Sequence, residues 1–256
     1  MLIDINTYVG HWPFRKLRHN TPAKLLKLMD AKGIDQACVS SVSGVFYKNP
    51  QTANDDLAKD TKRYRDRLHP FAVINPTYVD WEHDLRASAE AGFKGIRIYP
   101  SYHAYTPDDA CCSELASAAA EIGLIVSIPL RQTDARQRHW LINIPDMSAG
   151  SVAGLVSRHP KTRFMLVNGI GFTGSALGQA GNGLPDNYLI GISRMSALGH
   201  SEIRALIDNV GAERLAFGTG ACLKYPDPPL VKIEVTNATR AEKDRIRFRN
   251  AAKWLK

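Results

Sequence analysis

Eight short apolar segments, separated by stretches of helical character, restrict what this sequence can fold into. Most of them are nearly continuous apolar runs, which is typical of strands buried on both faces of a parallel sheet. They recur at a spacing of roughly 30 residues, as expected for βα units. The expected strands are Leu2–Asn6, Ala37–Ser41, Leu68–Asn75, Phe93–Tyr99, Leu124–Pro129, Arg163–Asn168, Tyr188–Ile192 and Arg214–Gly218.

The intervening segments carry start and stop signals of helices. Thr21 is an N-cap residue followed by Pro22 in the first helical position, and Gly33 ends that helix. Ser201 is expected to cap a later helix whose apolar residues share one face, and Gly211 follows it. Each helical segment leads within a few residues into the next expected strand.

Eight βα units in 256 residues match a (β/α)8 barrel, the TIM barrel. An open, doubly wound α/β sheet is the alternative, but it usually has a glycine-rich turn after its first strand. The segment Asn6–His11 has no such turn, and no linker or break in composition divides the chain. We therefore expect one α/β domain over residues 1–256, with any active site where the eight strands end.

The composition is that of an ordinary soluble protein, with 44% hydrophobic and 23% charged residues. No apolar run approaches the ~20 residues of a membrane span, and Met1–Asp4 does not begin a signal peptide. Cys38, Cys111, Cys112 and Cys222 lack metal-binding spacing. We expect them to be reduced thiols in a cytoplasmic protein.

The net charge of +8 raises the question of a nucleic-acid partner. The densest basic cluster lies in Arg240–Arg249, where acidic residues alternate with basic ones as on a solvated helix face. No recognition motif accompanies it. We expect a small-molecule substrate and neither a nucleic-acid nor a membrane partner, and the sequence leaves open whether the chain forms a homo-oligomer.

Cationic and titratable side chains follow several expected strands, and in a barrel such residues share one mouth. Arg97 and Arg131 each offer a guanidinium fork that can bind a carboxylate or stabilise a developing negative charge. His103 and His139 titrate near neutral pH. The candidates for catalysis are Arg97, His103, Tyr8 and His139.

Hydrogen-bonding side chains complete the expected mouth. Asparagine amides can hold a substrate hydroxyl or carbonyl, and tyrosine hydroxyls can donate a proton or a hydrogen bond. The candidates for substrate binding are Asn6, Tyr99, Arg131, Asn168 and His11. The last strand ends at Thr219-Gly220, with Cys222 and Lys224 beyond it. The segment Lys224–Ile233 is a candidate cover of the mouth.

Four segments, in the same order, resemble the amidohydrolase-related family of metal-dependent hydrolases, lactonases and decarboxylases. Ile3–Gly10 resembles the opening Asp-x-His-x-His-x-Gly of that family, and Phe93–Pro100 its mid-chain Gly-Phe-Lys-Gly-Ile-Arg strand. Leu215–Gly220 resembles its late Phe-Gly-Ser/Thr-Asp strand, and Asn250–Ala252 its last helix. The resemblance implies a TIM barrel that binds a divalent metal through two first-strand histidines, often a further histidine, and the last-strand aspartate.

The metal ligands that the resemblance implies are replaced in this chain. Asn6 and Tyr8 stand at the two histidine positions, Gly220 at the aspartate position, and Asn168 where a further histidine would be plausible. Amides and phenols are poor ligands for zinc, and glycine has no side chain. We therefore predict no metal site and no cofactor, so hydrolysis would need an electrophile and a base other than metal-bound water.

Three functions stay open. The first is a metal-independent member of this family that acts on a small polar or acidic substrate, such as a lactone, amide or sugar acid, by hydrolysis or by lyase chemistry. The second is a metal-dependent hydrolase or decarboxylase that holds zinc or a similar ion through His11, His103 or His139. The third is an inactive barrel that binds a ligand. We favour the first, because a mouth that had become mere packing would carry apolar replacements.

Overall fold

The computed structural model describes residues 1–195 and 201–256. Within them eight strands pair in chain order, and all neighbouring pairs are parallel. They are β1 (Ile3–Val9), β2 (Gln36–Ser41), β3 (Leu68–Val73), β4 (Gly95–Arg97), β5 (Ile125–Pro129), β6 (Phe164–Val167), β7 (Tyr188–Gly191) and β8 (Leu215–Ala216).

The last strand returns to the first and closes the barrel. The Ile5 amide donates to the Phe217 carbonyl at 3.0 Å, and Thr7 forms a parallel bridge with Ala221. The expected TIM barrel is confirmed, although β4 and β8 are shorter than predicted. Apolar residues such as Ile98 are buried beyond the paired segment, so burial alone overstates the length of a strand.

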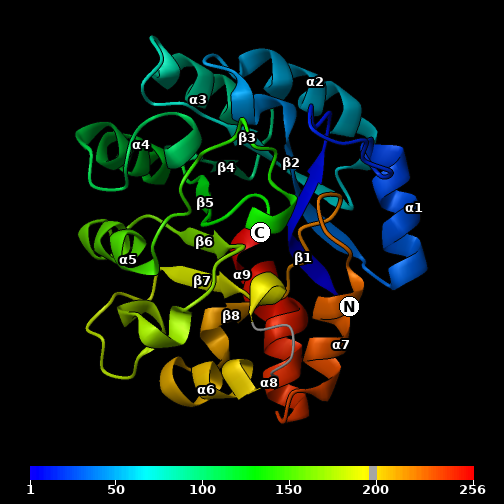
Figure 1. Ribbon diagram of the computed structural model, residues 1–256, viewed down its shortest axis with the longest axis vertical. Coiled ribbons are helices and arrows are strands. Elements are labelled where there is room, and N and C mark those ends of the chain that lie inside the picture. Colours follow the sequence, from blue (N-terminus) through cyan, green and yellow to red (C-terminus); the bar gives the residue numbers. More distant parts are fainter. Residues whose placement is uncertain (196–200) are drawn as a thin grey trace.

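Helices surround the barrel (Figure 1). They are α1 (Pro22–Lys32), α2 (Gln51–Thr61), α3 (Trp81–Glu90), α4 (Ala110–Glu121), α5 (Ala149–Arg158), α6 (Ser201–Val210), α7 (Asp227–Val235), α8 (Arg240–Asp244) and α9 (Asn250–Leu255). As predicted, the Thr21 side chain accepts from the Lys24 amide, and Gly33 ends α1 at φ +65°. Ser201 is the first residue of α6, so the position that would cap it lies outside the described residues.

Apolar side chains fill the inside of the barrel, and α9 closes one end of it. Ile5, Phe71 and Met165 belong to a buried cluster that also includes Ala251 and Leu255 of α9. Figure 1 accordingly shows α9 near the middle of the ring of strands. The open end is therefore the one where the strands terminate. None of the helices in the described part of the chain combines the length and apolar character that crossing a bilayer requires.

Candidate active site

An irregularity in β1 sets the direction of the first site residues. Between Asp4 and Thr7 the pairing with β2 shifts, so that three steps along β1 match two along β2. A bulge of this kind bends a strand and redirects its side chains. Arg97 of β4 spans the irregular stretch, because its two terminal nitrogens donate to the carbonyl oxygens of Ile5 at 3.2 Å and Thr7 at 3.1 Å.

Arg97 lies inside the barrel, below the mouth. Its side chain is fully buried, its Nε donates to the Ser127 hydroxyl at 3.2 Å, and its guanidinium carbon lies 4.6 Å from the centre of the Tyr8 ring. All three guanidinium nitrogens therefore donate to acceptors of the protein itself. The structure places Arg97 as a support of β1, whereas the sequence suggested a fork aimed at a substrate carboxylate.

Asp4 joins β1 to the segment after β8. Its carboxylate accepts from the Thr219 hydroxyl, from the backbone N–H of Thr219 at 3.0 Å and from the backbone N–H of Asn6 at 2.9 Å. Burial raises the pKa of Asp4 to about 7, although these donors and the charge of Arg97 act in the opposite direction. Asp4 thereby fixes the backbone on both sides of the mouth.

Asn168 is the centre of a buried polar network above this layer. Its Oδ1 accepts from Asn6 Nδ2 at 2.9 Å, from the Ser193 hydroxyl at 3.2 Å and from Lys224 Nζ at 2.6 Å. Its Nδ2 donates to the Tyr8 hydroxyl at 3.2 Å. Asn168 has a φ of +58°, an uncommon conformation for a residue other than glycine and one that concentrates at functional sites. We call these five side chains the Asn168 network, and it unites three predicted residues: Asn6, Tyr8 and Asn168.

Lys224 and Ser193 are the two members of this network to which the sequence analysis gave no role. A Cβ atom on Gly220 would lie 2.9 Å from Lys224 Cδ and 3.4 Å from Asn168 Oδ1, and Gly220 has a φ of +80°. The position at which the resemblance implies an aspartate is therefore glycine beside a lysine stem that fills the space. A lysine four residues after the missing carboxylate was the signal that could have identified it.

The surroundings of Lys224 disfavour its charged form. Burial lowers the pKa of the amine well below 10.5, and the positive charges of Arg194 and Arg131 lower it further. The fraction of molecules in which this side chain is a neutral amine at pH 7 is therefore larger than for a solvated lysine. A neutral amine can accept a proton or act as a nucleophile.

A cavity of about 420 Å³ opens beside the network. Its lining contains five basic side chains and one acidic side chain, Asp134, which pairs with Arg136 at 3.1 Å and with Arg194 at 3.4 Å. Hydrogen bonds from Arg136 hold the pKa of Asp134 below its usual range. The cavity, here the mouth pocket, therefore suits a small anion. Its polar and charged lining residues are Arg15, Gln132, Thr133, Asp134, Arg136, Gln137, Ser193, Arg194, Thr219, Lys224 and Lys232.

Two predicted residues line a much smaller space beside the mouth pocket. Tyr99 is buried, and burial raises the pKa of its hydroxyl well above 10. Arg131 forms an ion pair with Asp146, so its guanidinium is engaged within the protein. Gln132 lines both spaces and accepts from the Tyr8 hydroxyl at 3.5 Å, which connects them.

The three predicted histidines lie outside the Asn168 network. His103 is 8% exposed, and burial lowers its pKa to about 4, so it is neutral at pH 7. His139 stacks on Trp140, with ring centres 5.7 Å apart. His11 is exposed, and its amide donates to the Ser43 hydroxyl at 3.1 Å. None of the three histidines is among the residues that line the mouth pocket. No contact there supports the acid–base and binding roles predicted for them.

A sequence model described as amidohydrolase matches residues 7–172, which is more than half of the chain. The chain belongs to the amidohydrolase 2 family. No curated protein matches the sequence.

Solved structures that share the fold include a putative amidohydrolase from Staphylococcus aureus (TM-score 0.73, 15% identity, covering 99% of each chain). A dihydroxybenzoic acid decarboxylase from Polaromonas, with bound manganese and 2-nitroresorcinol, has a TM-score of 0.72 at 16% identity over 99% of this chain and 96% of that one. A 5-carboxyvanillate decarboxylase from Sphingomonas paucimobilis has a TM-score of 0.74 at 17% identity over 99% and 98%. At such identities the likeness concerns the fold.

The donors at the mouth of this amidohydrolase 2 member do not suit a divalent ion. Across residues 1–195 and 201–256, no three or more His, Cys, Asp or Glu side chains are grouped so that they could hold a metal. The Asn168 network supplies amides, hydroxyls and the amine of Lys224. An ammonium 2.6 Å from the amide oxygen would repel a second cation there. The histidines invoked for relocated metal binding form no such group either.

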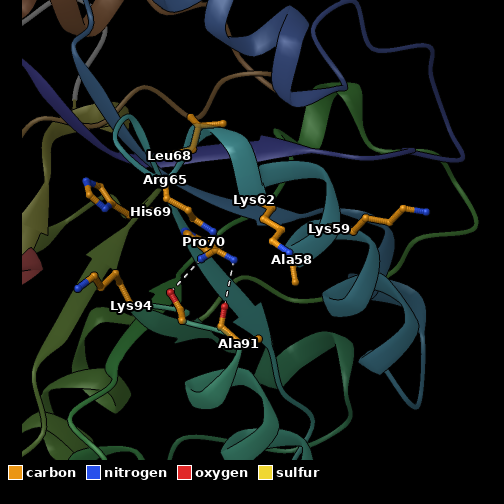
Figure 2. A pocket seen from close by; sticks show the side chains of 10 residues that line it. Ala58, Lys59, Lys62, Arg65, Leu68, His69, Pro70, Ala91 and Lys94 are labelled. Atoms are coloured by element: carbon orange, nitrogen blue, oxygen red, sulfur yellow. Dashed lines mark hydrogen bonds between the residues drawn. The ribbon is translucent and has the colours of Figure 1, made fainter.

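A larger cavity, of about 570 Å³, lies beside the first residues of β3 and the segment that leads into β4 (Figure 2). We call it the lower cavity; it is lined by Lys59, Lys62, Arg65, His69 and Lys94 with neighbouring small and apolar residues. Arg65 donates to the carbonyls of Ala91 at 3.1 Å and Gly92 at 2.9 Å, the dashed lines of Figure 2. His69 and Lys94 lie where β3 and β4 begin, whereas catalytic groups of such barrels come from the ends of strands.

Proposed function

We propose that this member of the amidohydrolase 2 family is a metal-independent lyase that removes carbon dioxide from a small carboxylate substrate in the mouth pocket. The observation that carries the proposal is the place of Lys224. Its amine is held 2.6 Å from Asn168 Oδ1, and its stem occupies space that a side chain at position 220 would need. A side chain of the protein thus supplies a cationic group beside the position of the family's metal-binding aspartate.

The charge of the mouth pocket supports a carboxylate substrate. Five basic side chains line it against Asp134 alone, and that carboxylate is already held by Arg136 and Arg194. A volume of about 420 Å³ accommodates a small organic acid. Two of the structures with this fold are decarboxylases named for carboxylated aromatic substrates.

The weak basicity of Asp134 favours decarboxylation over hydrolysis. Hydrolysis requires a group that takes a proton from water, and Asp134 is a weak base because Arg136 stabilises its carboxylate. Decarboxylation requires no attacking water. It requires stabilisation of the electron pair that remains when carbon dioxide leaves, which a fixed cation in a buried site supplies.

Hydrolysis of a small lactone or amide is the second candidate, and one observation favours it. The lowered pKa of Lys224 leaves part of the side chain as an amine that could itself take the proton from water. The products separate the two reactions, because one releases carbon dioxide and the other opens a ring or releases an amine.

The test is a substrate panel offered to protein that has been dialysed against a chelator. The panel contains 2,6-dihydroxybenzoate, 5-carboxyvanillate, 3-oxo acids and lactones, and carbon dioxide and acid release are both recorded. We expect metal-free turnover of a carboxylate that falls by about 10²-fold or more in Lys224→Met. Lys94→Met, in the lower cavity, is the control and should keep full activity. Turnover that appears only with added Mn²⁺, or a fully active Lys224→Met variant, would contradict the proposal.

A further inference from the structure

We propose that Lys224 forms an imine with its substrate, which is therefore a small 3-oxo acid, whose ketone carbon is bonded directly to the carbon that bears the carboxylate. This inference rests on the proposed function of the mouth pocket and assigns its substrate class. It also assigns Lys224 a covalent role in place of a purely electrostatic one.

The first support is the way in which the amine is held. The stem of Lys224 passes over Gly220, and its Nζ is fixed on Asn168 Oδ1. Asn6 and Ser193 donate to the same oxygen, so the acceptor itself is fixed in direction. A nucleophile held in this way loses little freedom when it attacks a bound carbonyl.

The second support is the position of Lys224 in the mouth pocket. Lys224 lines the mouth pocket together with Ser193, Arg194 and Thr219, so this lysine borders the space that a substrate would fill. The other lysine of this lining, Lys232, donates from its amine to the backbone carbonyl of Met195. Lys224 is thus the lysine of this pocket that joins the Asn168 network, and burial with nearby arginine charge keeps part of it unprotonated, as nucleophilic attack requires.

The chemistry balances without an oxidant, a reductant or a metal. The amine lone pair attacks the ketone carbon, the carbon–nitrogen bond forms, and the carbonyl oxygen leaves as water after taking up protons. The bond to the carboxylate then breaks, and its electron pair moves toward the positively charged imine nitrogen, giving carbon dioxide and an enamine. A proton adds to the enamine carbon, and water then releases the ketone and restores Lys224. The sum converts one 3-oxo carboxylate ion and one proton into one ketone and carbon dioxide.

Reductive trapping tests the covalent step. The chelator-treated protein is incubated with acetoacetate and sodium cyanoborohydride, and its mass is measured intact and after digestion. We expect a gain equal to the mass of the acid, or of its ketone product, less one oxygen atom, located on the peptide that contains Lys224. Lys94→Arg should be labelled like the wild type.

Lys224→Arg separates the two possible roles of this residue. Arginine keeps the positive charge but forms no imine of this kind, and circular dichroism confirms that the variant is folded. We expect no adduct and a decline of acetoacetate decarboxylation to the uncatalysed rate. Wild-type protein that acquires no label on Lys224, or a Lys224→Arg variant that decarboxylates acetoacetate normally, overturns the imine.

The outcomes also distinguish this inference from the function on which it rests. If the wild-type protein decarboxylates a carboxylate of the panel but acquires no label on Lys224, the imine is refuted and the metal-independent lyase stands. If Lys224 is labelled but no carboxylate of the panel releases carbon dioxide, the imine stands and the decarboxylase proposal is refuted.

Discussion

Replacing Arg97 with methionine tests whether this buried arginine supports the barrel and the site. Methionine has a similar length and no hydrogen-bond donor. The change leaves the carbonyls of Ile5 and Thr7 and the hydroxyl of Ser127 without the donor that each has now. Those acceptors lie inside a closed barrel, and the two carbonyls flank the irregular part of β1 that directs Asn6 and Tyr8 to the mouth.

The size of the effect follows from these contacts. An unpaired buried acceptor costs about 1–3 kcal/mol, and losing the guanidinium over the Tyr8 ring costs a further ~1 kcal/mol. Removing a buried charge offsets part of this loss. We expect the free energy of unfolding to fall by about 3–5 kcal/mol, which is large against the 5–15 kcal/mol typical of a whole domain.

Urea unfolding, followed by tryptophan fluorescence, measures this loss. Arg65→Met is the matched control, because Arg65 also donates to two backbone carbonyls but lies half-buried at the edge of the lower cavity. We expect the control to lose less than about 1 kcal/mol. Equal losses in the two variants would refute the role assigned to Arg97. If Arg97→Met does not fold, Arg97→Lys should fold and be less stable than the wild type.

Three further predictions concern Gly220, Asp4 and metal. Gly220→Ala should lower the free energy of unfolding by about 1–2 kcal/mol and reduce turnover, since φ at this position is +80° and the new Cβ would lie 2.9 Å from Lys224 Cδ. Thermal unfolding measures the first effect and the substrate panel the second. A variant with unchanged stability and turnover would contradict the close contact between position 220 and Lys224. Asp4 has a pKa of about 7 in the folded protein, against 3.8 for a solvated aspartate. Between about pH 4 and pH 7 its carboxyl group therefore binds a proton more readily in the folded state than in the unfolded state. The free energy of unfolding should therefore fall as pH rises from about 4 to about 7, by up to about 4 kcal/mol, and Asp4→Asn should abolish that slope in urea titrations. Excess Mn²⁺ should leave the Tm unchanged in differential scanning fluorimetry, because an ion that binds the folded state would raise it.

The barrel was predictable because its signals are local. Each apolar run and each helix boundary, such as Thr21 and Gly33 around α1, depends on neighbouring residues, and eight repeats leave few alternative folds. The grouping of Asn6, Tyr8 and Asn168 was also predictable, because parallel strands in a barrel end at one mouth. The amidohydrolase 2 family followed from short motifs in the right order, and the matching family model confirmed it.

The partners of the charged residues were not predictable from the sequence. Arg97 and Arg131 were both expected to face a substrate, yet one supports the bulge of β1 and the other pairs with Asp146. Whether a strand residue points into the pocket or below it depends on the register of the neighbouring strand. That register shifts between Asp4 and Thr7 in a way that no local pattern indicates.

The sequence by itself determined the class of fold, the family and the set of polar residues at the strand ends, because each of these is indicated by short patterns of neighbouring residues along the chain. Only the tertiary structure decided that Lys224 fills the space beside Gly220 and reaches Asn168, a residue 56 positions away. Contacts of that kind exist only once the barrel has closed, because closure alone brings the ends of β1, β6 and β8 within hydrogen-bonding distance.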